Sequence, residues 1–403
     1  MADILKPRNA KEVEDAVRWA LSDGKTLEVA GEGSKAAVGR PTQTDLTLDL
    51  SGLSGVTLYE PDELVLSAKA GTPLTEIETL VEKHNQQLDF EPIDYAALLG
   101  GKSRGTIGGA LAANLSGPRR IKAGAARDHF LGVTAVTGRG ETIKSGGRVV
   151  KNVTGYDLCK VLAGSWGTLA AMTDITIKVL PKAETEATIV IGGLDDAVAA
   201  KAMAAALGSP FDVSGAAHLP DHVASWFDGL PGIDASTVLR LEGFAPSVAH
   251  RSDALSVMMG KFGPVAILAE TQSRALWRAV RDAKPFAAET MRDRPLWRIS
   301  TAPSRGHEIA AQITPAAQMF YDWGGGLVWV AMPFAGEPDA AAIRAAVRKV
   351  GGHATLVRAP AAVRAAVDVF EPQEPGVAAL SKRVKDAFDP NGVFNPGRMW
   401  AGV

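Results

Sequence analysis

Cysteine is nearly absent from this chain of 403 residues, and other features that would define a functional class are scarce as well. The single cysteine, Cys159, excludes a disulfide within the chain and any iron–sulfur cluster ligated by this chain's cysteines alone. A formal net charge of −2 gives no basic field of the kind that nucleic-acid binding needs. The remaining composition, 46% hydrophobic and 22% charged, is typical of a globular enzyme or binding protein.

Long apolar segments are missing too. No run approaches the roughly 20 apolar residues that a membrane-spanning helix needs. The first seven residues, from Met1 to Pro7, contain no apolar stretch typical of a secretion signal. We therefore expect a cytoplasmic protein, which reaches the cytoplasmic face of a membrane only through partner subunits.

A glycine-rich loop follows the strand that the apolar pattern predicts at residues 27–30. The loop consists of Gly31, Glu32, Gly33, Ser34 and Lys35. With Ala36 it matches the dinucleotide fingerprint G-x-G-x-x-A, but Gly39 and Pro41 interrupt the helix that a Rossmann unit needs at this point. We interpret it as a tight loop whose backbone N–H groups bind an anion, with an ordinary turn as the alternative.

A second glycine motif precedes an Ala/Leu segment. It reads Thr106, Ile107, Gly108, Gly109, and the segment ends at Asn114, Ser116 and Gly117. Adjacent glycines let the backbone approach a ligand, and a helix starting here would turn its free N–H groups toward that ligand. A packing role for the glycines is the alternative. The cations that follow, Arg119, Arg120 and Lys122, either neutralise a bound diphosphate or form a solvated turn.

These motifs, followed by Gly155-Tyr156-Asp157 and by Gly-Ser-Trp-Gly-Thr-Leu at residues 164–169, occur in an order that resembles the vanillyl-alcohol oxidase/PCMH family of FAD-binding flavoproteins. The resemblance covers roughly residues 1–180 and recurs near the C-terminus. Within the family, the chain is most similar to the FAD-binding subunits of bacterial glycolate oxidases. This resemblance implies FAD-dependent oxidation of glycolate to glyoxylate, in a complex with a related flavin-containing subunit and an iron–sulfur subunit.

The resemblance also implies how individual residues contact FAD. Residues 31–35 would hold the diphosphate, and residues 106–109 would approach the diphosphate and the ribityl chain. The segment from Asn114 to Gly117 would lie toward the isoalloxazine, while Ser165, Gly167 and Ile175 would lie near the adenine. Asn395, in the C-terminal Pro/Gly-rich tail, would offer an amide to the ring edge or the ribityl hydroxyls. Neither glycine loop contains the histidine that links the flavin in covalent relatives, so we expect non-covalent FAD.

The fold class that follows is α+β. We expect a PCMH-type FAD-binding domain of two α+β subdomains at residues 1–182. An α+β cap domain with one sheet backed by helices follows at 183–375, where strands alternate with Ala-rich helices. The C-terminal helix and tail at 376–403 would return to complete the FAD domain.

The cap region offers few catalytic candidates. Related 2-hydroxy-acid dehydrogenases carry a histidine-rich metal motif on a cap strand, but the corresponding strand after Gly324 has no histidine. We therefore predict no metal site. Arg298, within a predicted strand, is a candidate to bind the substrate carboxylate, with an exposed structural arginine as the alternative. A non-catalytic flavin carrier or scaffold subunit, and a self-sufficient oxidase of another 2-hydroxy acid or alcohol, are the other functions left open.

Overall fold

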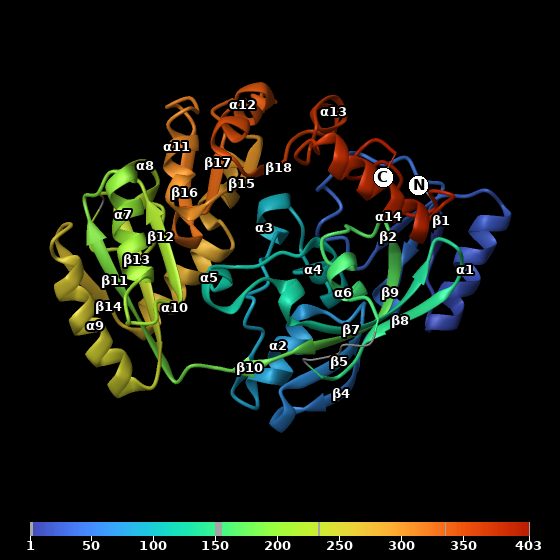
Figure 1. Ribbon diagram of the computed structural model, residues 1–403, viewed down its shortest axis with the longest axis horizontal. Helices are drawn as coiled ribbons and strands as arrows, with labels where there is room; N and C mark the ends of the chain where they lie inside the picture. Colours follow the sequence, from blue (N-terminus) through green and yellow to red (C-terminus); the bar gives the residue numbers. More distant parts are fainter. Residues whose placement is uncertain (1–2, 150–154, 233, 335, 403) are drawn as a thin grey trace. The chain divides into compact units, whose positions relative to one another are not determined.

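The computed structural model describes residues 3–149, 155–232, 234–334 and 336–402. Contacts within the chain divide it into two compact units. Unit 1 comprises Met1–Ser116, Gly124–Lys182 and Pro372–Val403, and unit 2 comprises Gly117–Ala123 and Ala183–Glu371. In Figure 1, unit 1 therefore combines the blue and teal N-terminal segments with the red C-terminal one. The sequence had suggested that residues 117–123 belong to the first domain, whereas their contacts lie in unit 2.

The first sheet of unit 1 is parallel, with strand order β1 (Asp3–Leu5), β3 (Leu46–Asp49), β2 (Leu27–Ala30). Helix α1 (Ala10–Ser22) starts at Asn9, whose side chain accepts a hydrogen bond from the Glu12 amide. Its buried face contributes Val13, Val17 and Ala20 to the core of this sheet. Because parallel strands need a crossover, residues 31–45 leave the end of β2 as a long connection, and this connection contains the first glycine loop.

The second sheet of unit 1 is antiparallel and buries the larger core. Its strand order is β4 (Val56–Glu60), β5 (Val65–Lys69), β9 (Ala170–Lys178), β7 (Phe130–Thr137), β8 (Thr142–Gly146). The helices of this part are α2 (Leu74–Glu82), α3 (Ala96–Leu99), α4 (Ile107–Ala113) and α6 (Leu158–Leu162). A short antiparallel pair, β6 (Gln86–Gln87) with β10 (Leu180–Pro181), completes it.

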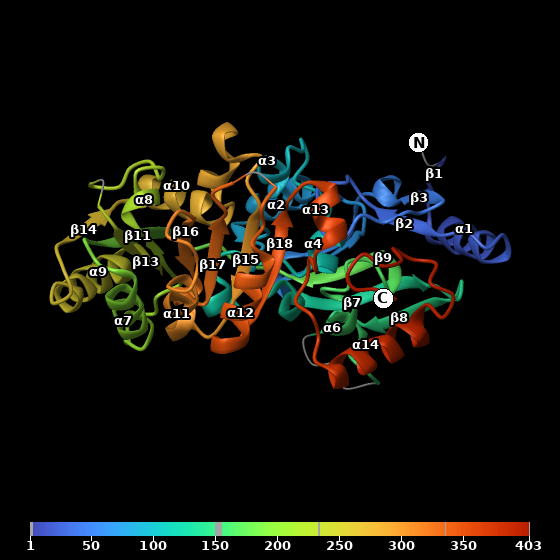
Figure 2. The ribbon, with the colours of Figure 1, turned by 90° about the horizontal axis from the view of Figure 1, so that it is seen from above.

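The C-terminal segment returns to unit 1. Helix α14 (Pro375–Phe388) packs Val384 and Phe388 against the core of the second sheet, and Figure 2 shows it beside β7 and β8. The tail after it reaches the first sheet, where Phe394 is fully buried and forms a bridge with Leu27 of β2. Val393 and Phe394 thus belong to the core of the first sheet.

Unit 2 contains one antiparallel sheet of eight strands. Their order is β14 (Val265–Leu268), β11 (Thr185–Gly192), β13 (Ser236–Gly243), β12 (Gly215–Leu219), β16 (Gln318–Asp322), β17 (Leu327–Ala331), β15 (Leu296–Ser300), β18 (His353–Arg358). The helices are α5 (Arg120–Ala123), α7 (Asp196–Leu207), α8 (Asp221–Ala224), α9 (Ala245–Met259), α10 (Glu270–Arg281), α11 (Gly306–Ala310), α12 (Ala340–Val350) and α13 (Ala361–Ala366).

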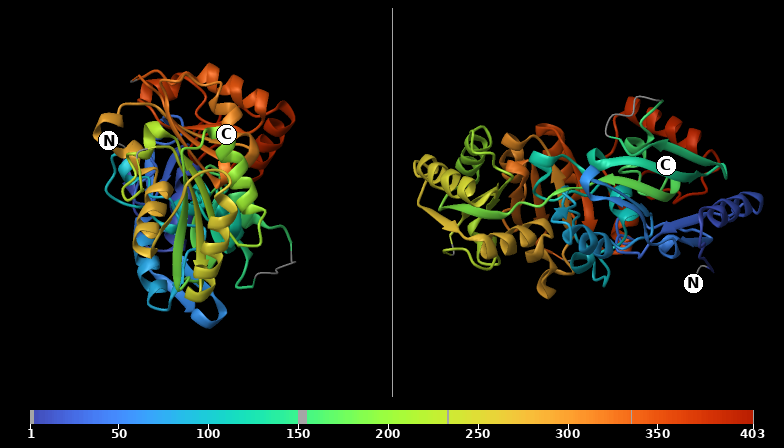
Figure 3. Two further views of the ribbon diagram at one scale, coloured as in Figure 1. Left: turned by 90° about the vertical axis from the view of Figure 1, so that its left-hand side faces the viewer. Right: turned by 90° about the horizontal axis from the view of Figure 1, so that it is seen from below.

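Helices cover both faces of this sheet near β11. Ile189 and Ile191 pack in a core with residues of α7 and α9. Thr188 points to the opposite face, because neighbouring residues of a strand alternate, and its hydroxyl bonds to Ser273 and to the indole N–H of Trp277 on α10. The edge-on view in Figure 3 shows strands with helices on either side.

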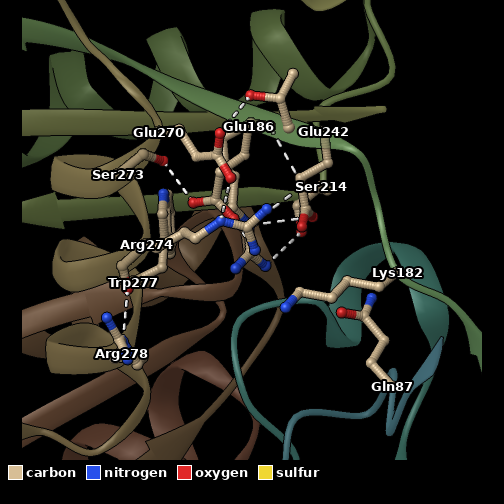
Figure 4. A network of polar contacts seen from close by, with 12 residues as sticks. Gln87, Lys182, Glu186, Ser214, Glu242, Glu270, Ser273, Arg274, Trp277 and Arg278 are labelled. Carbon is tan, nitrogen blue, oxygen red and sulfur yellow. Dashed lines mark hydrogen bonds and ion pairs between the residues drawn. The ribbon is translucent and has the colours of Figure 1, made fainter. Parts of the chain in front are cut away.

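A buried polar network lies on the α10 face (Figure 4). Arg240 of β13 is 1% exposed, and its guanidinium lies 4.8 Å from the Trp277 ring centroid and 3.3 Å from Glu242. Arg119 donates from Nε to Glu242 at 3.0 Å, so this ion pair attaches residues 117–123 to unit 2. Burial alone would raise the pKa of Glu242, but the charges of Arg240 and Arg119 outweigh it and hold the pKa far below its ordinary value.

Within the described ranges, no helix combines the length and the apolarity needed to cross a membrane.

Candidate functional site

A pocket in unit 1 is formed where the first glycine loop meets the second. Its walls are residues 28–36, the start of α4, residues 166–167 and Arg398, and it encloses about 740 Å³ of free space including its open mouth. Of the residues predicted to contact FAD, the pocket brings together Gly31, Glu32, Gly33, Ser34, Lys35, Thr106, Gly108, Gly109 and Gly167.

The first glycine loop presents backbone donors. Among the described residues, the N–H groups of Glu32, Gly33, Ser34 and Lys35 have no hydrogen-bond partner. Gly33 has φ +70°, a left-handed conformation that glycine adopts without steric cost. Successive N–H groups on such a turn form a concave anion site, which matches the interpretation of the loop from the sequence.

Lys35 adds a buried cation to these donors. The residue is 8% exposed, and its ammonium donates to the Ser34 hydroxyl at 3.1 Å. Burial lowers the pKa of Lys35 to about 8, and the charges of Arg104 and Arg398 act in the same direction. A cation that has lost water in this way gains strongly from an anionic ligand, because the ligand restores the interactions that favour its charged form.

The N–H groups at the start of α4, in the second glycine motif, already have hydrogen-bond partners within the chain. The N–H groups of Ile107 and Gly108 donate to Thr72 O at 3.0 Å and Ala70 O at 2.9 Å, and the Gly109 N–H donates to the Thr106 hydroxyl at 3.2 Å. The prediction that the first turn of this helix offers free N–H groups is therefore wrong. The preceding turn at residues 70–72 accepts the first two of these hydrogen bonds, and the capping residue Thr106 accepts the third.

The two glycines of this motif have separate roles. A Cβ at Gly108 would lie 2.7 Å from Ala70 O, so glycine is needed there for the close packing of α4. A Cβ at Gly109 would lie 4.0 Å from the Lys35 ammonium, where it would project toward the pocket. Close packing therefore accounts for Gly108, and close approach to a ligand stays a prediction for Gly109.

Asn395 joins three segments beside the pocket. Its side-chain amide donates to Trp166 O at 3.2 Å and Gly167 O at 3.0 Å, and its carbonyl accepts from the Val29 N–H at 3.2 Å. Asn395 is fully buried and does not line the pocket, so these contacts hold the pocket walls rather than present an amide to it.

Arg398 and Trp166 are among the pocket residues that were not identified from the sequence. The guanidinium of Arg398 lies 5.6 Å from the Trp166 ring centroid and donates to Lys35 O at 3.0 Å. Trp166 is one of few non-glycine residues with positive φ, at 52°. Both lie inside motifs that carried the resemblance, the Gly-Ser-Trp-Gly segment and the C-terminal Asn-Pro-Gly-Arg segment, and this is the signal that could have pointed to them.

The other predicted FAD contacts lie outside the pocket wall. Ile107 and Ile175 are buried in the core of the second sheet. Asn114 ends α4 with φ +49° and accepts the Arg127 N–H at 3.0 Å, while Ser116 accepts the Ala126 N–H at 2.8 Å and Ser165 donates to Leu162 O at 2.7 Å.

Gly117 belongs to unit 2, where its carbonyl accepts from the Trp323 indole at 3.0 Å. The cations after it also make their contacts within unit 2: Arg119 with Glu242, Arg120 with Trp323 and Lys122 with Asp212. The interpretation that these three neutralise a diphosphate gains no support from these contacts.

Arg298 lies on β15 of unit 2, opposite Trp329 of β17 and Thr355 of β18. Its guanidinium carbon is 4.8 Å from the Trp323 ring centroid, and that of Arg120 is 4.6 Å from the same ring. Loss of water around the His353 ring lowers the pKa of His353, and the charges of Arg298 and Arg120 lower it further. Unit 2 therefore gathers two arginines and a histidine that favours its neutral form.

The donors in the unit 1 pocket fit the diphosphate of a dinucleotide cofactor. Four backbone N–H groups that have no partner among the described residues and a buried ammonium are complementary to a dianion, and a Cβ at Gly109 would lie 4.0 Å from that ammonium. Within the described residues, no group of three or more His, Cys, Asp or Glu side chains is placed to hold a metal ion.

Comparison with known proteins decides the family. Residues 2–146 match the family profile described as FAD binding domain. The chain is 33% identical over 394 residues to glycolate oxidase subunit GlcE of Escherichia coli (strain K12), an alignment that covers 96% of each protein. The chain belongs to the vanillyl-alcohol oxidase/PCMH family of FAD-binding flavoproteins.

Further relatives of this flavoprotein agree. Glycolate oxidase subunit GlcD of Bacillus subtilis (strain 168) is 24% identical over 429 residues, which cover 99% of this chain and 88% of GlcD. The structure of p-cresol methylhydroxylase with substrate bound superposes with a TM-score of 0.69 at 13% identity, covering 98% of this chain and 88% of that protein, which shows the shared fold. The cofactor of this flavoprotein is FAD, and the α+β fold class expected from the sequence is confirmed.

Proposed function

We propose that this flavoprotein oxidises glycolate, or a closely related small 2-hydroxy acid, as one subunit of a larger enzyme. The observation that carries the proposal is the similarity to GlcE along nearly the whole of both chains, together with a pocket whose N–H donors suit a diphosphate. Other relatives with shorter alignments include a D-lactate dehydrogenase of Archaeoglobus fulgidus, so 2-hydroxy acids as a class are favoured over phenols or other alcohols. The partners would be a related flavin-containing subunit and an iron–sulfur subunit.

FAD, when bound, supplies an acceptor for the hydride that leaves the α-carbon of the substrate. The residues of unit 1 would hold it without a covalent bond: residues 31–35 would contact the diphosphate, and Gly109 would leave room for it. In unit 2, Arg298 binds the substrate carboxylate through two parallel hydrogen bonds, as a planar guanidinium can. The hydroxyl proton has to pass to a base as the hydride leaves, and glycolate becomes glyoxylate.

The flavin spectrum of the purified chain tests the proposal. Flavin absorbance that bleaches anaerobically on addition of glycolate would show that this chain carries a complete active site. Bands that persist with the chain alone but bleach once the partner subunits are added would support a subunit that needs its complex. Bands that persist in both cases would contradict oxidation of glycolate and favour a flavin carrier, and failure to bind FAD would favour a scaffold.

Two variants locate the site. Gly109→Val should remove the flavin absorbance while the far-ultraviolet circular dichroism stays unchanged, because its side chain would project toward Lys35. Gly376→Ala is the control, since its Cβ would meet no atom within 4 Å. Arg298→Met should keep the flavin but raise the KM for glycolate by about 10- to 100-fold, the range expected for a lost charge-assisted contact. Full flavin retention in Gly109→Val would refute the placement of FAD.

A further inference from the structure

We propose that the Lys35 side chain is the ionic partner of the FAD diphosphate and that FAD binding by this protein takes up a proton. The inference rests on the placement of FAD proposed above. It assigns a role to the side chain of Lys35, whereas only the backbone of this residue was expected to contact the cofactor.

The position of the Lys35 side chain supports its role as the ionic partner of the diphosphate. Lys35 is 8% exposed, lines the pocket, and lies beside four N–H groups that have no partner among the described residues. An ammonium has three N–H donors, and in the described part of the chain only the Ser34 hydroxyl accepts one of them. The position that a Gly109 Cβ would occupy lies 4.0 Å from the ammonium, so the group faces the open space between the two glycine motifs.

The negative charges around Lys35 do not compensate for its burial and for the nearby positive charges. Four of them act on it: Asp94 and Glu32 favour its charged form, and Arg104 and Arg398 oppose it. The acids have other contacts, because Asp94 lies 3.5 Å from Arg104 and Glu32 accepts a hydrogen bond from Ser103. Arg398 stacks near Trp166 and bonds to the Lys35 carbonyl. A diphosphate in the pocket would supply the missing negative charge.

The sign of the proton linkage follows from this environment. In the free protein, burial holds the pKa of Lys35 near 8. A bound dianion raises this pKa, so above pH 8 the complex holds a proton that the free protein has lost. FAD affinity should therefore be constant below about pH 7 and should fall by up to about tenfold per pH unit above pH 8.

The experiment is an FAD titration of the deflavinated protein between pH 6.5 and 9.2, followed by flavin fluorescence. Lys35→Arg should bind FAD with no pH dependence, because arginine stays charged throughout. Lys35→Met should bind about 10- to 100-fold more weakly at pH 7, also without pH dependence. Lys102→Met, at an exposed lysine of a neighbouring loop, is the matched control and should behave as wild type.

A second measurement needs no variant. Calorimetric titration of wild type at pH 8.5, in two buffers of different ionisation enthalpy, should show uptake of about 0.8 proton per FAD. No proton uptake, or an unchanged pH slope in a folded Lys35→Met protein, would overturn the inference. Failure of the wild type to bind FAD in this pocket would instead overturn the proposed function, so the two outcomes are distinct.

Discussion

At the residue scale, single polar side chains hold the walls of the unit 1 pocket together, and Asn395 is the clearest case. It is fully buried and has φ +43°, a conformation that asparagine tolerates better than most residues. Its one amide group satisfies two carbonyls and one N–H from segments that are more than two hundred residues away in the sequence. Few other side chains of this size carry both an N–H donor and a carbonyl acceptor.

Asn395→Ala should therefore lower the free energy of unfolding of unit 1 by about 2–4 kcal/mol, because buried groups lose their partners. FAD affinity should fall with it, since the walls at residues 29 and 166–167 are no longer joined. Urea unfolding and an FAD titration measure the two effects. Asn391→Ala, in an exposed turn of the same tail, is the control and should change neither. Equal effects of the two substitutions would contradict this role.

At the element scale, helix α14 is attached to unit 1 by a buried ion pair. Lys385 donates to Asp389 at 2.7 Å, to Thr168 O at 2.6 Å and to Phe394 O at 3.1 Å. Asp389 has no exposed side-chain surface and also accepts the N–H groups of Val393 and Phe394. The pair thereby links the end of the helix to the tail that continues to Asn395.

Lys385→Met should destabilise the protein by about 3–5 kcal/mol, because it leaves a buried carboxylate without its cation. The same helix offers a matched control: Lys382 and Asp386 form an exposed pair with the same spacing. Lys382→Met should cost about 0.5 kcal/mol or less. Thermal unfolding of both variants tests the difference, and similar losses would show that burial of the pair is not what matters.

Strand β12 packs closely against the polar network of unit 2 at Gly215. A Cβ at Gly215 would lie 3.0 Å from the Trp277 ring and 3.2 Å from Arg240 Nε, the two groups that stack in the polar network of unit 2. Gly215→Ala should cost about 1–3 kcal/mol through overpacking. Gly260→Ala, whose Cβ has only ordinary contacts, is the comparison. A stability of Gly215→Ala equal to wild type by urea unfolding would show that this stack can shift freely.

At the scale of the whole molecule, acid stability should depend on the charge network of unit 2. The folded-state pKa of Glu242 lies below the ordinary value of 4.5, so its contribution to stability is present above about pH 4.5 and is lost as the pH falls below it. Burial raises the pKa of Glu186, so the contribution of Glu186 to stability changes with pH in the opposite direction.

Glu242→Gln should lower stability at pH 7 by about 3 kcal/mol, because Arg240 and Arg119 lose a buried counterion. The fall in stability between pH 6 and pH 3 should then be shallower than in wild type. Glu270→Gln, an exposed carboxylate of the same network, should leave the pH profile unchanged. Unfolding midpoints measured across this pH range test the difference in slope. Parallel profiles for Glu242→Gln and wild type would contradict the role of Glu242 in acid stability.

Local sequence patterns by themselves determined most elements of this protein and pointed to the first glycine loop. Capping at Asn9, the strand at residues 27–30 and the nest at residues 31–35 depend on neighbours in the sequence, so they could be inferred without a structure. Strands β12 and β16 were missed because they are buried on both faces and show no clear alternation.

Only the tertiary structure decided which of these groups meet. The first two amides of α4 donate to the turn at residues 70–72, Arg398 and Trp166 join Lys35 at the pocket, and residues 117–123 belong to unit 2. Each of these pairings joins residues that local patterns cannot relate. A hydrogen bond or ion pair forms between whichever groups the packed cores bring within about 3 Å, and the chain's order alone does not specify that distance.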